Sequence, residues 1–164
     1  MIGSYEFWKT AHILSAAVLL GTGFGIAYFC WFGYRAALRS GEIMTLRSFL
    51  RLTVLADAWL TAPAVVFQAI SGIVLMYLLG WSMTSQWSVA VWTLFVLVGA
   101  CWLPVVAIQI RLRREADRVS SVAALPARFH RAFRIWFALG VPAFALVVVL
   151  YYMMVARPLP VTAS

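Results

Sequence analysis

The stretch RLRREADRVSSVAALPARFHRAFR, from Arg111 to Arg134, decides the fold because it sets seven arginines between two long apolar runs. A second basic segment, from Arg35 to Arg51, carries four more arginines and is also flanked by apolar sequence. Together the two segments hold eleven of the thirteen Lys and Arg residues of the chain. Short loops rich in Lys and Arg stay on the cytoplasmic side of a membrane. The pattern therefore predicts a membrane protein with two cytoplasmic loops.

The composition indicates the same class of protein. The chain is 65% hydrophobic and 11% charged, whereas soluble domains are about 25% charged. A transmembrane helix needs about 20 mainly apolar residues. We expect one all-α domain over residues 1–164, a transmembrane four-helix bundle whose spans cover about residues 8–32, 54–79, 87–110 and 135–156. Four spans joined by these cytoplasmic loops put both termini on the external, periplasmic side.

The net charge of +8 does not indicate a nucleic-acid-binding protein. The cations flank the spans and do not alternate with residues of a polar recognition surface. Cations in these positions define the topology and contact anionic lipid headgroups. The expected partner is therefore the lipid bilayer, and we expect no binding of nucleic acid.

Glycines and prolines mark the expected ends and bends of the helices. The first helix is expected to continue past its span and end at Ser40-Gly41, and the second to begin within residues 46–51. Residues 80–87 form an external turn, and the proline-containing tail Arg157–Val161 is expected to be a short external coil. Bends are expected at the three prolines inside the spans, Pro63, Pro104 and Pro142.

Small residues and cysteines inside the spans point mainly to packing. Gly21 and Gly25 have the four-residue spacing that lets a neighbouring helix backbone come close. This role is favoured, although such a face also admits a flat ligand, and we expect a homo-oligomer or a subunit of a membrane complex. Cys30 and Cys101 lie within spans, so we expect free buried thiols with neither a disulfide nor a metal site.

His12 is the strongest candidate for a functional residue, because polar groups inside a bilayer are costly. It lies in the first span, one turn beyond Lys9 in the stretch WKTAHI. A neutral imidazole in an apolar bundle can ligate haem iron through one ring nitrogen while a hydrogen bond orients the other. We therefore expect His12 to ligate the iron of haem b and Lys9, nearer to water, to contact a propionate. The alternative is a histidine that only hydrogen-bonds to a neighbouring helix.

The depth of His12 in the membrane limits the choice of a second axial ligand. Met76, Met153 and Met154 lie at similar depth in the second and fourth spans, and a thioether ligand raises the reduction potential of haem. A five-coordinate iron is equally open, because methionines in apolar helices usually only pack. His130 is excluded as a ligand, because it belongs to the opposite, basic side.

Other polar residues give weaker predictions. Asp57 follows Arg51 by six residues and is expected to pair with an arginine at the inner edge, with a proton relay as the alternative. Gln68 and Gln109 are expected to hydrogen-bond between helices, with contact to a quinone carbonyl as the alternative. His130, next to Arg131, is expected to lie among lipid phosphates.

The motif Trp8-Lys9-x-x-His12-Ile13, at the start of a four-span chain, resembles that of HemJ-type protoporphyrinogen oxidases. In those membrane proteins the histidine of the motif holds haem b, so the resemblance implies the same for His12. The oxidases also carry a lysine in the outer part of the third span. The corresponding window here, WSVAVW at residues 87–92, contains none. The resemblance therefore implies haem binding and does not extend to the oxidation of protoporphyrinogen.

Most of the chain is similar to an uncharacterised bacterial family of four-span integral membrane proteins, a domain of unknown function. Three stretches carry this similarity: Pro63-x-x-x-x-Gln68-x-x-Ser71-Gly72, CWLPVV-x-x-Gln109 from Cys101, and WF-x-x-G-x-PAF from Trp136. The similarity implies a multi-pass protein of the bacterial cytoplasmic (inner) membrane and supplies no activity.

Together these features predict a haem b-binding membrane protein that acts in electron transfer or as a small membrane oxidoreductase. A quinone or an external electron carrier is the expected redox partner. The alternative class is a cofactor-free membrane scaffold, assembly factor or transporter subunit. Among charged residues only Asp57 approaches the middle of the membrane, which argues against an ion-coupled transporter.

Overall fold

The computed structural model describes residues 2–160, and these residues form helices and no strand. Four helical segments are long and apolar enough to cross a membrane: residues 3–40, 43–79, 86–117 and 127–156. The predicted all-α bundle of four spans is confirmed. The elements in chain order are α1 (Ile2–Ser40), α2 (Ile43–Ala56), the π-helical turn η1 (Asp57–Thr61), α3 (Ala62–Leu79), α4 (Gln86–Asp117), the 3-10 turn η2 (Val122–Ala124) and α5 (Ala127–Ala156).

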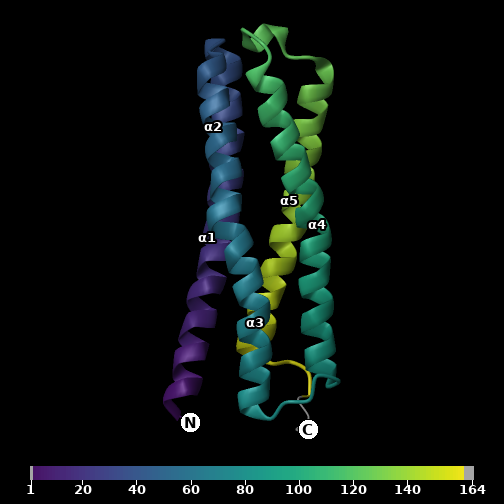
Figure 1. Cartoon of the computed structure of the whole chain (residues 1–164). Helices are drawn as coiled ribbons and strands as arrows, with labels where there is room; N and C mark the ends of the chain where they lie inside the picture. Colours follow the sequence, from purple (N-terminus) through teal and green to yellow (C-terminus); the bar gives the residue numbers. More distant parts are fainter. Residues whose placement is uncertain (1, 161–164) are drawn as a thin grey trace.

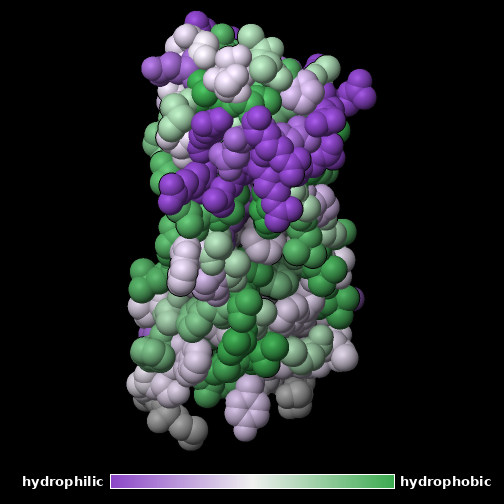
Figure 2. Space-filling view, turned by 45° about the horizontal axis from the view of Figure 1, so that its top comes forward, coloured by the Kyte–Doolittle hydropathy of each residue, from purple (hydrophilic) through white to green (hydrophobic). Residues whose placement is uncertain are grey.

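The helices are longer than the expected spans. With 39 residues, α1 is about 58 Å long, which is about twice the thickness of a hydrocarbon core. In Figure 1 both chain ends and the turn between α3 and α4 lie at one end of the bundle, which we call the terminal end. The opposite end carries Arg35–Arg51 and Arg111–Arg134 and is called the basic end. Figure 2 shows hydrophilic residues gathered near the basic end, with more apolar surface over the rest of that face.

The expected helix boundaries are confirmed where glycine permits a left-handed backbone. Gly41 has a φ of 74° directly after α1, and Gly80 has a φ of 64° directly after α3. A side chain disfavours this conformation, so glycine is the usual residue at such helix ends. Ser85 begins α4 by accepting a hydrogen bond from the backbone N–H of Ser88 at 3.2 Å. Arg157–Pro160 is non-helical as expected, and Val161 lies outside the described residues.

The bend expected at Pro63 takes the form of a π turn. The backbone N–H of Ala62 donates to the carbonyl of Asp57, five residues earlier. Pro63 has no N–H with which to continue the ordinary α-helical ladder, and π turns often occur at functional sites. The axis of α3 consequently leans away from that of α2 (Figure 1).

The tightly packed core lies towards the basic end, where all four spans contribute side chains. Phe129 and Phe133 of α5 and Leu46 and Leu50 of α2 are all fully buried there. The buried cluster consists of Cys30, Ala37, Ile43, Leu46, Leu50, Val105, Leu112, Ala116, Val122, Leu125, Phe129, Phe133 and Trp136. Towards the terminal end the strongest packing is pairwise, α1 on α3 and α4 on α5.

Arg47 ties α2 to the end of α4. Its guanidinium donates to the carbonyls of Ala116 at 3.0 Å, Asp117 at 3.4 Å and Val119 at 2.7 Å. The last carbonyls of a helix lack partners inside the helix, so a cation there satisfies them and opposes the helix dipole. Arg47 therefore stabilises the junction between α2 and α4.

The close helix approach expected at Gly21 and Gly25 is found at another glycine. A Cβ built at either of these residues would meet no atom within 4 Å. At Gly33, in contrast, a Cβ would lie 2.3 Å from the ring of Phe49. Within the chain, the glycine that lets α1 and α2 pack closely is therefore Gly33. The prediction about Gly21 and Gly25 is wrong for contacts between the chain's own helices.

Candidate functional site

His12 lies between α1 and α3 in the half of the bundle nearer the terminal end. Its Nδ1 is 2.7 Å from Oγ of Ser71, and its Nε2 is 2.9 Å from Nε2 of Gln68. Ser71 and Gln68 are three residues apart on α3, so both face α1. The alternative interpretation, in which His12 hydrogen-bonds to a neighbouring helix, predicts such bonds, and both are present.

The hydrogen bonds of Ser71 set the tautomer of His12. The Ser71 hydroxyl donates to the backbone carbonyl of Phe67 at 2.7 Å. Because a hydroxyl has a single proton, Oγ of Ser71 is left to accept from Nδ1–H of His12. The Nε2 lone pair then accepts an N–H from the Gln68 amide. His12 is therefore a neutral imidazole whose Nε2 has an unprotonated lone pair, the form that ligates metals.

Small and aromatic residues shape the space around the imidazole. A Cβ built at Gly72 would lie 3.5 Å from Cε1 of His12, which is an ordinary van der Waals contact, so Gly72 lies directly beside the ring. Trp8, one turn before His12 on α1, stacks on Phe67 of α3 with ring centroids 6.1 Å apart. Ser15 donates to the carbonyl of Ala64 at 3.1 Å, one turn nearer the basic end. Contacts between α1 and α3 thus hold the ring from both sides along the helices.

Gln68 has unused hydrogen-bonding capacity. Its Oε1 is buried and has no hydrogen-bond partner, while its Nε2 donates to His12. A buried polar atom without a partner costs about 1–3 kcal/mol. The Gln68 amide is therefore only half satisfied in this position. The other buried side-chain polar atoms without a partner among the described residues are Thr61 Oγ1, Trp102 Nε1 and Tyr151 Oη.

The other residues predicted for the haem site are not joined to His12. Among residues 2–160, no hydrogen bond, ion pair or ring contact links His12 to Lys9 or to the three methionines. Lys9 is exposed, with Nζ 5.5 Å from the Tyr5 ring centroid. Met76 is buried on α3, the helix that holds His12. Met153 is buried on α5, where its carbonyl accepts from the Trp87 indole at 3.0 Å, and Met154 is 37% exposed.

A second polar cluster lies at the π turn. Asp57 accepts a hydrogen bond from Nε2 of Gln109, and Oε1 of Gln109 accepts from the Trp136 indole at 3.2 Å. All three side chains are at least nine-tenths buried. An indole nitrogen can only donate, so it fixes the Gln109 amide with its N–H groups towards Asp57. The predicted helix-to-helix hydrogen bonding of Gln109 is confirmed.

The predicted pairing of Asp57 with an arginine is wrong. The ion pairs among the described residues are those of Glu115 with Arg111 and Arg128. Six residues along an α-helix turn a side chain to a face about 120° away. Arg51 is accordingly exposed, whereas Asp57 is 6% exposed and faces α4.

A separate buried hydrogen bond joins α1 and α2, one turn before Asp57 in the chain. Sγ of Cys30 lies 2.6 Å from Oγ1 of Thr53, and both side chains are buried. Side chains from each of the four spans therefore meet near the π turn. Within the described part of the chain no three His, Cys, Asp or Glu side chains are grouped to hold a metal ion. A haem iron differs from such a centre, because it needs only one or two protein ligands.

His130 lies at the basic end, as expected, and has a partner on α1. Its Nδ1 is 2.6 Å from the hydroxyl of Tyr34, and the ring is half-buried against α1 and is not surrounded by solvent. Tyr34 is 22 residues from His12 on the same helix, which corresponds to about 33 Å. His12 and His130 therefore cannot share one haem, as the sequence predicts. The expected position of His130 among lipid phosphates stays a prediction.

Comparison with known proteins identifies the family. No curated protein and no solved structure matches the chain. A family model described as "Predicted integral membrane protein (DUF2269)" matches residues 6–158. The match covers all four spans and both polar clusters. The chain therefore belongs to this family of predicted integral membrane proteins.

Proposed function

We propose that this membrane protein binds haem b through Nε2 of His12 and acts in electron transfer or as a small membrane oxidoreductase. The observation that carries the proposal is the hydrogen bond from Nδ1–H of His12 to Ser71. Histidines that ligate metals usually donate their other ring N–H to an oriented acceptor, which fixes the tautomer and the ring. Bound haem would supply a one-electron redox centre, with a quinone or an external electron carrier as the redox partner.

Residues around His12 have distinct roles in this proposal. Ser71 holds the imidazole in its ligating tautomer, and Gly72 lies directly beside the ring. Gln68 occupies Nε2, so its side chain must turn away before iron binds. Its partnerless Oε1 makes that movement less costly, because the amide is not fully satisfied where it is. Lys9, one turn nearer the terminal end, is the proposed propionate contact.

The sixth ligand in this proposal is a methionine or is absent. Met76, Met153 and Met154 stay equal candidates, of which Met76 and Met153 are buried and Met154 is 37% exposed. Met153 packs where α4 meets α5, since its carbonyl receives the Trp87 indole. A thioether opposite His12 would raise the reduction potential relative to a second histidine.

A second candidate function follows from the same hydrogen bonds. Both ring nitrogens of His12 have partners on α3, so the imidazole can serve as a cofactor-free clamp between α1 and α3. The protein would then be a membrane scaffold, an assembly factor or a subunit of a larger complex. The two functions differ in what Gln68 does, because it competes with haem iron in the first and supports packing in the second.

Replacing Gln68 by Ala separates the two candidates. If iron and the Gln68 amide compete for Nε2, the variant should bind haem about three- to tenfold more tightly, the value of one net hydrogen bond. Absorbance titration of haem into detergent-purified wild-type and variant protein measures this. Gln86→Ala, which changes an exposed glutamine outside both polar clusters, is the control and should leave haem affinity unchanged. The haem proposal would be contradicted if neither the wild type nor Gln68→Ala binds haem. A Gln68→Ala protein that is also less stable than the wild type would support the clamp.

We also infer that the terminal end faces the periplasm and the basic end the cytoplasm of a bacterial inner membrane. The arginine content of the basic end supports this orientation. A reporter enzyme that is active only in the periplasm should therefore be active when fused after Ser164. The same reporter fused after Ser121, between α4 and α5, should be inactive. The reverse pattern of activities would invert the topology.

A further inference from the structure

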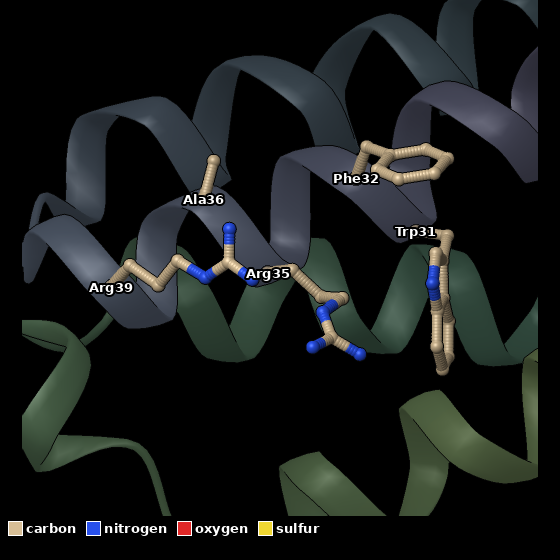
Figure 3. Close-up of a pocket in the computed structure, with 5 residues that line it drawn as sticks. All are labelled: Trp31, Phe32, Arg35, Ala36 and Arg39. Carbon is tan, nitrogen blue, oxygen red and sulfur yellow. The ribbon is translucent and has the colours of Figure 1, made fainter.

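A hollow of about 460 Å³ opens on α1 near the basic end. It is lined by Trp31, Phe32, Arg35, Ala36 and Arg39 (Figure 3). Figure 3 shows Trp31 and Arg35 on the same side of the helix, and the Arg35 guanidinium lies 6.0 Å from the centre of the Trp31 ring. Trp31 also packs on Phe137 of α5, with ring centroids 4.5 Å apart. The hollow therefore has an aromatic wall anchored to α5 and a cationic side.

Both guanidinium groups of the hollow are available to an external anion. Arg35 and Arg39 are exposed, and neither belongs to an ion pair among residues 2–160. Residues four apart on a helix lie about 5–6 Å from each other, so both can reach one ligand. Guanidinium groups bind phosphate oxygens in pairs of parallel hydrogen bonds. The chemistry of the hollow thus fits a phosphate group.

The position of the hollow fits the headgroup region of a bilayer. Trp31 lies at the end of the expected first span, where indole rings favour the interface. Arg35 and Arg39 follow it by one and two helical turns, which places them progressively further from the hydrocarbon. Clusters of arginine and lysine at the cytoplasmic end of a transmembrane helix are typical sites for anionic lipid headgroups.

An exposed aromatic ladder runs from the hollow towards the middle of the membrane. The ladder consists of Phe24, Tyr28 and Phe32, spaced four residues apart on α1 and 59%, 49% and 54% exposed. Ring centroids are 6.2 Å apart between Phe24 and Tyr28 and 4.6 Å apart between Tyr28 and Phe32. Phe32 belongs both to the ladder and to the hollow. A continuous apolar track therefore leads directly away from the two cations.

We propose that the hollow and the ladder together bind one anionic glycerophospholipid. Its phosphate lies on Arg35 and Arg39, and an acyl chain follows Phe32, Tyr28 and Phe24. A soluble phosphate ester has the same phosphate chemistry, but it has no acyl chain that could contact the aromatic ladder. The site is separate from His12, because Phe24 and Arg35 follow His12 by 12 and 23 residues on α1, which is about three and six helical turns.

Native mass spectrometry of the detergent-purified protein tests this site. The probes are phosphatidylglycerol, zwitterionic phosphatidylcholine, and glycerol 3-phosphate, which has no acyl chain. The double variant Arg35→Gln/Arg39→Gln should bind phosphatidylglycerol about thirtyfold more weakly, since each cation near a membrane surface contributes about a factor of five. Phosphatidylcholine should bind wild-type protein more weakly than phosphatidylglycerol does.

A matched control removes the same charge elsewhere at the basic end. Arg51→Gln/Arg114→Gln changes two exposed arginines outside the hollow and should leave phosphatidylglycerol binding nearly unchanged. Tyr28→Ala should weaken phosphatidylglycerol binding without affecting glycerol 3-phosphate. Equal losses in the two double variants would overturn the site in favour of general surface charge. Glycerol 3-phosphate that binds as tightly as phosphatidylglycerol would overturn the assignment to a lipid.

Discussion

Replacing His12 by Ala is expected to remove the haem absorption of the purified protein entirely. His12 supplies the only imidazole at the terminal end, and the structure holds its ring in the neutral tautomer that can bind iron. A methionine alone does not retain haem b as an imidazole does. The measurement is the Soret absorbance per protein, with both proteins purified from haem-replete cells.

His130→Ala is the matched control for this prediction. His130 lies at the basic end, bonded to Tyr34, so its loss should leave the Soret band unchanged. Ser71→Ala should retain haem at lower occupancy, because the ring keeps Nε2 but loses the acceptor that orients Nδ1. If the His12 and His130 variants are equally red, His12 is not the ligand.

Replacing Gln109 by Leu is expected to lower the free energy of unfolding by about 3 kcal/mol, because two buried groups lose their partners together. Asp57 would lose its amide donor and Trp136 its acceptor, and both are at least nine-tenths buried. Leucine has a volume similar to that of glutamine, but it has no amide to donate to Asp57 or to accept from Trp136. Reversible unfolding in mixed micelles, followed by circular dichroism, measures the change.

Two milder substitutions show whether the hydrogen bonds themselves carry this stability. Trp136→Phe removes only the indole donor, so it should cost less than Gln109→Leu. Asp57→Asn keeps an oxygen that can accept from Gln109, so it should be close to wild type. A Gln109→Leu protein as stable as wild type would show that the Asp57–Gln109–Trp136 chain does not hold the bundle together.

The sequence predicts the architecture because a bilayer leaves few alternatives. Backbone groups in hydrocarbon must be satisfied within a helix, so long apolar runs between arginine-rich segments are read as spans. The ends at Gly41 and Gly80 were also predictable, because only glycine adopts their backbone conformation readily. The ends of α4 and α5 at the basic end were not, because arginine and alanine favour the helix and extend it beyond the apolar run.

The polar sites were predictable as residues but only partly as partners. His12, Gln68 and Gln109 stand out because polar groups are costly in a membrane. Their partners depend on how each helix is rotated about its axis, which hydropathy does not report. The sequence could have excluded Arg51 as the partner of Asp57, because six residues do not bring two side chains to the same helix face. Ser71, the other partner of His12, follows Gln68 by three residues on the same face, but a serine in an apolar helix gives a weaker signal than a histidine or a glutamine.

The visible absorption spectrum of the wild-type protein tests the proposed function most directly. Protein purified in detergent from haem-replete cells and scanned before and after dithionite should be red, with a Soret band that sharpens and shifts on reduction. A colourless protein that also binds no added haem would contradict the role of His12 as an iron ligand. The imidazole would then remain a clamp between α1 and α3.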